Sequence, residues 1–241
     1  MSLWLCDNFA ALRERKMSIN TKKYKELLAE IGDKVNLVAV SKTKSVEDIK
    51  ALYDLGQRDF GENYVQELVD KYEALPKDIQ WHFIGHLQTN KVKYIAQFVS
   101  LIHGVDSLKL LQEINKQGEK NNRIINCLLQ IHIAQEETKF GLNEDELDDI
   151  IGSAELKNLK NIKISGLMSM ASFTENEETI RNEFRYLKTL YNSYNQLQIA
   201  NCKLQILSMG MSADYKIAIE EGSNMVRIGS LIFGERDTIN K

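Results

Sequence analysis

Short apolar runs alternate with amphipathic stretches along almost the whole chain. The run 37–40 (LVAV) is apolar, rich in valine and bounded by polar residues, which predicts a buried strand. Comparable runs predict further strands at 58–61, 81–84, 99–105, 123–133, 162–168, 204–207 and 225–228. The stretches between them have helical periodicity and predict helices at 45–56, 63–74, 91–98, 107–118, 143–156, 177–197 and 212–221. A further helix is expected within 4–31.

The alternation predicts an α/β fold. Parallel neighbours need a helical crossover, so sustained strand–helix alternation implies a parallel sheet. Eight strands favour closure into a single (β/α)8 TIM barrel with an extra N-terminal helix. Residues 229–241 leave room only for a short helix, so we expect the amino-terminal helix to take the eighth place in the outer ring. The predicted domains are an extension at 1–19, taken as helical, and a barrel at 20–241.

Two serines have the position of helix N-caps. Ser45 precedes the second predicted helix and has Asp48 three residues later, a weaker form of the capping box. Ser212 is the first residue of the helix predicted at 212–221, and Asp214 lies in its first turn.

Lys42 lies just beyond the first predicted strand. Strand alternation places it on the face shared by Val38 and Val40. Poor solvation there would lower the pKa of its amine, and an uncharged amine can form a Schiff base with a carbonyl compound. The alternative is a lysine whose stem packs at a strand end while its ammonium reaches water.

The ends of the last two strands carry small residues. Ser208–Ser212 follows strand seven and Gly229–Ser230 follows strand eight, where barrels of this kind often bind phosphate with loop amides. These could equally be ordinary loop residues. Arg227 interrupts the last apolar strand, so it needs either a structural ion pair or a ligand acceptor.

A candidate amine and a phosphate cradle leave two chemistries open. One is a cofactor-free phosphosugar aldolase. The other is bound pyridoxal 5'-phosphate (PLP), whose aldehyde meets Lys42 while its phosphate lies at strands seven and eight. A lysine on the first strand favours the second.

Composition narrows the classes of function. The chain has 241 residues and a net charge of -3, which argues against a general nucleic-acid binder. Its apolar runs are too short for a membrane span, and its start lacks the basic region of a signal peptide. Three scattered cysteines favour free thiols in a cytoplasmic protein. His82 and His86 flank a strand end, where their spacing does not converge, so no metal site is expected; His103 and His132 are expected as hydrogen-bonded core residues.

Several motifs closely resemble the YggS/PROSC family of pyridoxal phosphate homeostasis proteins. In chain order they are 39–44 (AVSKTK), 60–67 (FGENYVQE), 81–85 (WHFIG), 166–168 (GLM), 207–212 (LSMGMS) and 226–229 (VRIG). The resemblance runs from about residue 20 to the end of the chain. It implies a barrel like the amino-terminal domain of alanine racemase.

The resemblance also implies a set of cofactor contacts. PLP would be held covalently on Lys42, with Asn63 and His82 lining its ring. Ser212, Gly229 and Ser230 would bind the phosphate, where Ser230 replaces the more usual threonine, and Ser208 is a further candidate cofactor-binding residue. Arg227 would face the pyridine nitrogen. Lys139 resembles a lysine proposed in the family as a secondary contact, although Phe140 departs from the smaller residue expected beside it.

The expected role is a PLP carrier without robust catalysis. A guanidinium beside the ring nitrogen discourages its protonation and weakens the ring as an electron sink. The sequence also leaves no room for the second domain of a racemase. We therefore expect a monomer that buffers PLP in the cytoplasm and transfers it, with apo PLP-dependent enzymes as candidate partners. The alternative is a small PLP-dependent amino-acid racemase.

Overall fold

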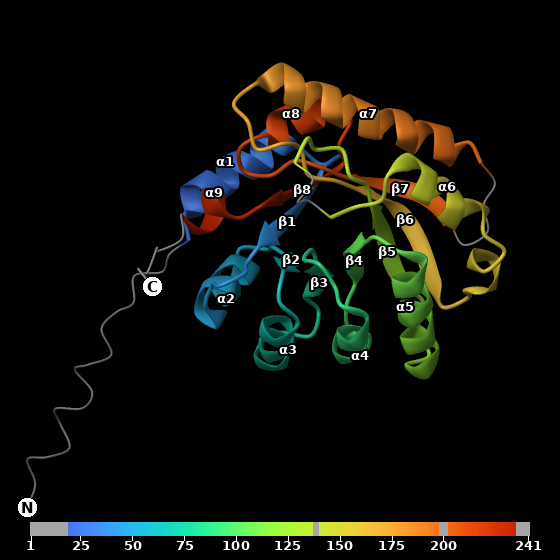
Figure 1. Ribbon diagram of the computed structural model, residues 1–241. Coiled ribbons are helices and arrows are strands. Elements are labelled where there is room, and N and C mark those ends of the chain that lie inside the picture. Colours follow the sequence, from blue (N-terminus) through green and yellow to red (C-terminus); the bar gives the residue numbers. More distant parts are fainter. Residues whose placement is uncertain (1–18, 137–139, 198–201, 235–241) are drawn as a thin grey trace, which may run out of the picture.

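The structure is a computed structural model, and it describes residues 19–136, 140–197 and 202–234. Eight parallel strands close into a barrel in chain order, with β8 paired back to β1 (Figure 1). The strands are β1 (Asn36–Val40), β2 (Asp59–Glu62), β3 (Gln80–Phe83), β4 (Leu101–Val105), β5 (Ile125–Gln130), β6 (Ile162–Met168), β7 (Cys202–Ser208) and β8 (Met225–Ile228). The predicted (β/α)8 barrel is confirmed.

Helices surround the barrel and follow the predicted order. They are α1 (Thr21–Ile31), α2 (Val46–Asp54), α3 (Val65–Ala74), α4 (Val92–Ile95), α5 (Leu108–Lys120), α6 (Glu144–Gly152), α7 (Glu177–Asn195), α8 (Tyr215–Glu220) and α9 (Ser230–Phe233). Short 3-10 turns lie at η1 (Thr89–Lys91) and η2 (Leu156–Asn158). The predicted strand at 123–133 is shorter than expected, because β5 ends at Gln130.

The amino-terminal helix α1 packs beside the end of the chain. It contacts α9, and the backbone N–H of Asn20 donates to the carbonyl of Ile232 at 2.7 Å (Figure 1). The Tyr215 hydroxyl at the start of α8 donates to Glu30 of α1 at 2.9 Å. Residues 1–18, which make up almost all of the predicted extension, lie outside the described residues.

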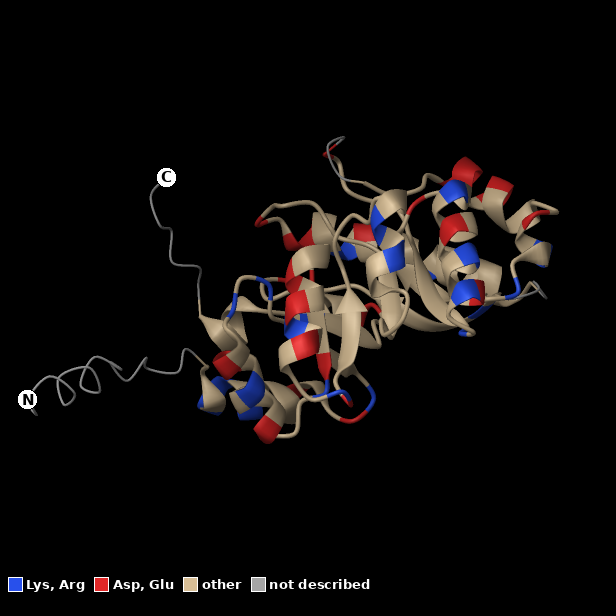
Figure 2. Cartoon of the chain, turned by 90° about the horizontal axis from the view of Figure 1, so that it is seen from below, with Lys and Arg blue, Asp and Glu red and all other residues tan. Residues whose placement is uncertain are grey.

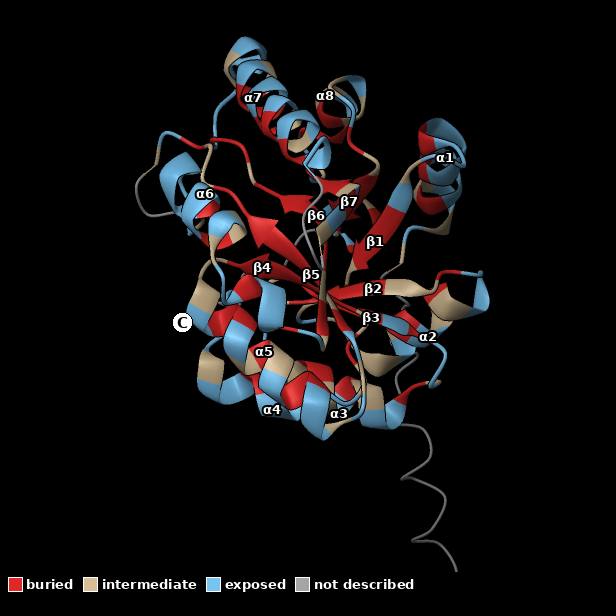
Figure 3. Ribbon diagram, turned by 90° about the vertical axis from the view of Figure 1, so that its right-hand side faces the viewer, coloured by how far each residue is buried: buried red, intermediate tan, exposed pale blue. Residues whose placement is uncertain are grey.

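Side chains alternate between the barrel interior and the layer under the helices. The interior apolar cluster comprises Val38, Leu101, Leu128, Met168 and Met225, while apolar residues on the opposite faces of the strands join the larger core between sheet and helices. Figure 3 shows this arrangement, with buried strands at the centre and helices exposed on their outer faces. Because β1 pairs with β8 through Val38 and Arg227, these two positions lie at the same level of the barrel.

The outer surface mixes both signs of charge. Figure 2 shows acidic and basic residues interspersed on the helices. None of the helices described combines the length and apolar character that a bilayer crossing requires. Among the described cysteines, Cys127 and Cys202 are free, and Cys6 lies outside the described residues.

The two predicted N-caps have different outcomes. The Ser45 hydroxyl accepts from the N–H of Asp48 at 3.2 Å and caps α2 as expected. The N-cap prediction for Ser212 is wrong, because residues 212–214 form a turn and the helix begins at Tyr215. The Asp214 carboxylate accepts from the N–H of Met211 at 2.6 Å, which holds this turn closed.

Candidate functional site

A cavity of about 500 Å³ opens at the carboxyl-terminal ends of the strands. Its lining comes from segments that follow β1, β2, β3, β6, β7 and β8 and from the ends of β1 and β8. The lining residues are Val40, Lys42, Lys44, Asn63, Ile84, Met170, Phe173, Met211, Ser212, Ala213, Arg227, Gly229, Ser230 and Gly234. Its volume lies in the usual range for a small-molecule or cofactor site.

Lys42 enters this cavity at the end of β1. It is half-buried, and Val40, two residues earlier, lines the same space. Val38, four residues earlier, lies in the barrel interior. The predicted face of Lys42 is therefore the inner one. Thr43 follows with φ +65°, a left-handed conformation that is unusual for a β-branched residue.

The turns after β7 and β8 lie beside this lysine. Ser212, Gly229 and Ser230 all line the cavity. A Cβ added to Gly229 would lie 3.1 Å from the carbonyl oxygen of Val40, so only a glycine fits here without displacing β1. Pairing of β1 with β8 thus brings the predicted amine and the predicted phosphate cradle to one cavity.

Gly210 shapes the turn after β7. Its φ is +97°, and an added Cβ would lie 2.6 Å from the Cβ of Ala218. Its carbonyl accepts from the N–H of Arg227 at 3.0 Å, which ties this turn to β8. The turn therefore has one permitted residue at this position.

Arg227 lines the cavity from β8 and is almost completely buried. One terminal nitrogen donates to the carbonyl and the hydroxyl of Ser208, at 2.9 and 2.7 Å. The other terminal nitrogen donates to the carbonyl of Ser169 at 2.9 Å. Burial lowers the pKa of Arg227 to about 10, so the guanidinium stays charged at neutral pH. The hydrogen bonds named here all go to neutral oxygens, and the Asp214 carboxylate adds an electrostatic attraction to the guanidinium.

Asn63 also lines the cavity, just after β2. Its side-chain Oδ1 is buried and has no hydrogen-bond partner among the described residues. A buried polar atom without a partner costs free energy, and binding a ligand donor would remove that cost.

A buried network behind Lys42 was not predicted from the sequence. The Lys71 ammonium on α3 donates to the Ser41 carbonyl and to the carboxylates of Glu62 and Glu67, at 2.7, 2.8 and 2.7 Å. Glu67 also accepts from the N–H of Thr43 at 2.5 Å. Burial raises the pKa of Glu62 to about 7, against the opposing attraction of Lys71. This network fixes the backbone on both sides of Lys42.

Two predicted cofactor contacts lie elsewhere. His82 is not among the cavity-lining residues; it is buried in the barrel interior and bonds to Asp59 and His103. Its place on β3, below the strand end, accounts for this, because Ile84 is the β3-side residue that reaches the cavity. Ser208 is also buried and contacts Arg227 instead of lining the cavity. Lys139 lies outside the described residues.

The residues of this cavity fit PLP. An amine can hold an aldehyde covalently, and glycine and serine turns can bring backbone N–H groups close to a phosphate. The buried guanidinium can donate to a ring acceptor, and the unpartnered Asn63 oxygen supplies a further polar contact.

Comparison with known proteins identifies the family. The family model of the alanine racemase N-terminal domain matches residues 14–237. The pyridoxal phosphate homeostasis protein of Aquifex aeolicus is 44% identical over 201 residues, covering 83% of this chain and 86% of that protein. The pyridoxal phosphate homeostasis protein of Escherichia coli K12 is 37% identical over 241 residues, covering 98% of this chain and 99% of that protein. The chain belongs to the pyridoxal phosphate homeostasis protein family.

Solved structures agree with this membership. PipY of Synechococcus elongatus without PLP superposes with a TM-score of 0.83 at 30% identity, covering 91% of this chain and 100% of PipY. PipY with PLP bound gives 0.80 at 31% identity, covering 88% and 99%. Alanine racemase of Clostridium difficile shares the fold of this family member, with a TM-score of 0.70 at 18% identity; the match covers 92% of this chain and 59% of the racemase.

Proposed function

We propose that this chain binds PLP as a Schiff base on Lys42 and serves intracellular PLP homeostasis by buffering and transferring the cofactor. The observation that carries the proposal is the convergence of Lys42, Arg227 and the Gly229–Ser230 turn on one cavity. The names of its relatives and the PLP-bound PipY structure support the same ligand.

Each residue of the cavity has an assigned role in this proposal. Ser212, Gly229 and Ser230 would bind the phosphate through hydroxyl and backbone N–H groups. Asn63 would contact the ring, and Arg227 would donate to the ring nitrogen. Ser208 would act one step away, by holding Arg227 through two hydrogen bonds. His82 has no direct role at the ring in this proposal.

Arg227 favours a carrier over a catalyst. When bound, PLP supplies an electron sink whose strength depends on protonation of its ring nitrogen. A guanidinium has five N–H donors and no acceptor, so it cannot stabilise a proton on that nitrogen. Its positive charge opposes such a proton further. Arg227 would therefore disfavour protonation of a bound ring, which suits storage of the cofactor.

The covalent link is tested with purified protein loaded with PLP. Borohydride reduction followed by peptide mass spectrometry should place the reduced adduct on Lys42. Lys42→Ala should lose the adduct and the visible absorbance band, whereas the exposed Lys50→Ala should keep both. An adduct that persists undiminished in Lys42→Ala would refute the assignment.

A small amino-acid racemase remains the second candidate, because the fold and the candidate lysine would suit either role. Turnover assays on several amino acids separate the two. Sustained racemisation that disappears in Lys42→Ala would favour the enzyme over the carrier. Transfer of PLP to an apo PLP-dependent enzyme, in a cytoplasmic setting and by a monomer, is the behaviour expected of the carrier.

A further inference from the structure

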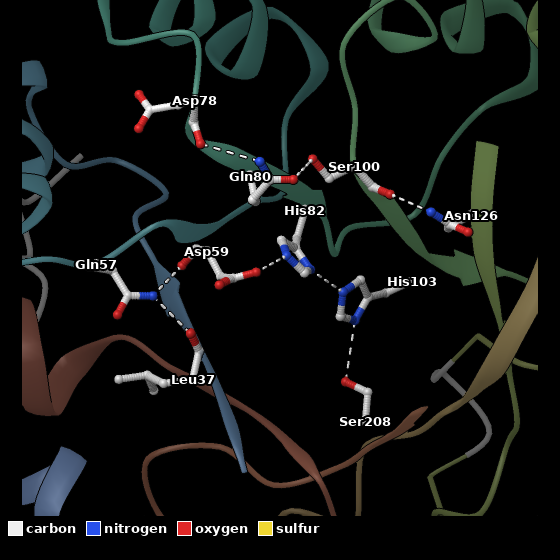
Figure 4. A network of polar contacts seen from close by, with 10 residues as sticks. All are labelled: Leu37, Gln57, Asp59, Asp78, Gln80, His82, Ser100, His103, Asn126 and Ser208. Atoms are coloured by element: carbon white, nitrogen blue, oxygen red, sulfur yellow. Dashed lines mark hydrogen bonds and ion pairs between the residues drawn. The ribbon is translucent and has the colours of Figure 1, made fainter. Parts of the chain in front are cut away.

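A line of hydrogen bonds runs through the barrel interior below Arg227. Asp59 Oδ1 lies 2.8 Å from His82 Nε2, and His82 Nδ1 lies 2.9 Å from His103 Nε2 (Figure 4). His103 Nδ1 lies 3.3 Å from the Ser208 hydroxyl, which in turn accepts from Arg227 at 2.7 Å. We call these five residues the interior chain.

The interior chain joins the two mouths of the barrel. Arg227 lines the candidate PLP cavity, whereas Asp59 and His82 line a second cavity of about 310 Å³. The Asp59 side chain is 38% exposed, while His82, His103 and Ser208 are buried. Asp59 begins β2 and Asn63 follows its end, so at about 3.3 Å per residue the mouths are about 13 Å apart along that strand.

The chemistry of the two ends sets the direction of every bond between them. Arginine only donates, so the Ser208 oxygen accepts from Arg227, and its own hydroxyl proton can be donated to His103 Nδ1. A neutral His103 then carries its proton on Nε2 and donates to His82 Nδ1. A neutral His82 in turn donates from Nε2 to the Asp59 carboxylate, which only accepts when ionised.

His103 is held neutral at the centre of this chain. Burial lowers its pKa well below the ordinary value, and the nearby His82 and Arg227 act in the same direction. A neutral imidazole has one donor and one acceptor, so its tautomer is fixed by its neighbours. With both imidazoles neutral, the hydrogen bonds of the interior chain therefore have one consistent set of donors and acceptors.

We propose that the interior chain positions the Arg227 guanidinium and makes that position depend on the protonation state of His82 at the opposite mouth. Ser208, His103 and His82 are then positioning residues for the PLP site. The predicted effect on PLP rests on the proposed function, whereas the hydrogen-bond arrangement of the interior chain does not.

Protonation of His82 would break the arrangement. A second N–H on Nδ1 would point at the N–H of His103 Nε2 across 2.9 Å, so the contact would have to open or His103 would have to change tautomer. In the other tautomer, His103 Nδ1–H and Arg227 would both donate to the Ser208 oxygen, so the Ser208 hydroxyl proton would lose its acceptor and the hydroxyl that holds Arg227 would have to reorient. The charged groups that bear on the interior chain are Asp59 and Lys163 at the far mouth, and Arg227 with Asp214 at the near one.

The tautomers are tested on the cofactor-free chain. The protein has four histidines, so nitrogen-15 histidine spectra can be assigned with His86→Asn and His132→Asn variants. Above neutral pH, His82 and His103 should both carry the proton on Nε2. A proton on Nδ1 of either residue would overturn the proposal, and this readout does not depend on PLP.

The coupling is tested on the PLP-loaded chain. Asp59→Asn replaces a carboxylate that only accepts by an amide that also donates, so the direction of the hydrogen bonds along the interior chain is no longer enforced. The pH midpoint of the visible band should shift relative to the unsubstituted protein, while Asp54→Asn, on the exposed end of α2, should match it. Identical midpoints in the unsubstituted protein and Asp59→Asn would overturn the coupling. A complete lack of a visible band in the unsubstituted protein would instead refute the proposed function.

Discussion

The ammonium of Lys71 lies 2.7 Å from the carbonyl oxygen of Ser41, the residue immediately before Lys42. The same ammonium contacts the carboxylates of Glu62 and Glu67, and Glu67 accepts from the N–H of Thr43, immediately after Lys42. A single buried cation thus organises the backbone that carries the candidate PLP-binding lysine.

Lys71→Met should strongly destabilise the fold. The substitution leaves the Glu62 carboxylate buried without its cation, and breaking one partner of a buried pair costs about 3–5 kcal/mol. Urea unfolding above pH 7, where Glu62 is ionised in the fold, measures the change. Lys50→Met, which removes an exposed pair with Asp54, should cost at most about 1 kcal/mol. Equal effects of the two substitutions would show that the buried network contributes little.

Glu62 should give the fold a specific pH dependence. Its pKa rises from an ordinary 4.5 to about 7, so between these values the folded chain binds a proton that the unfolded chain has released. The contribution is fully present below pH 4.5 and is lost as the pH rises through about 7, with a ceiling of about 3 kcal/mol.

Unfolding free energies of the unsubstituted chain and Glu62→Gln, measured from pH 5 to 8, check this sign. The stability of the unsubstituted chain relative to the variant should fall across that interval and level off above it. A relative stability that rises with pH would mean that Glu62 is ionised in the fold throughout.

Gly210→Ala should destabilise the turn that ties β7 to β8. The added Cβ would meet Ala218 at 2.6 Å, and φ +97° is unfavourable for alanine, so we expect a loss of about 2–4 kcal/mol. Thermal unfolding is a suitable measurement. Gly152→Ala, where nothing lies within 4 Å of the new Cβ, should be neutral or slightly stabilising. A neutral Gly210→Ala would show that this turn can change conformation freely.

Thr43→Gly should stabilise the chain modestly. A left-handed conformation costs an L-residue about 1–2 kcal/mol, part of which is offset by the greater freedom of glycine in the unfolded chain. The expected net gain is about 0.5–1 kcal/mol in urea unfolding. Asn122→Gly, at φ +52°, should change less because asparagine tolerates this conformation. A destabilised Thr43→Gly would indicate that the threonine side chain makes a compensating contact.

The sequence predicted the barrel and the convergence at its mouth for clear physical reasons. Alternating apolar runs specify the strands, and parallel pairing brings their carboxyl ends together, so Lys42 and the Gly229–Ser230 turn could be placed on one rim. Strand alternation also put Val40 and Lys42 on the inner face. The start of α8 was harder to predict, since both Ser212 and Asp214 are residue types that cap helices. In the structure the Asp214 carboxylate accepts from the N–H of Met211 in the turn before the helix, and α8 begins at Tyr215.

Features that depend on packing between distant elements could not be predicted. Lys71 falls within the helix predicted at 63–74, and only the assembled barrel shows it buried against Glu62. The prediction that His82 lines the ring came from a motif match, which specifies the order of residues along the chain but not how far below the strand ends a side chain lies. The depth came from its contact with His103 across β3 and β4.

The closure of β8 onto β1 means that the two halves of the candidate site are supplied by the first and the last strands of the barrel. When the first three-quarters of the chain has been translated, Lys42 has been made, but the turns after β7 and β8 that would bind the phosphate have not. PLP binding by this protein would therefore have to follow translation of β8. Retention of PLP would then indicate that the barrel has closed.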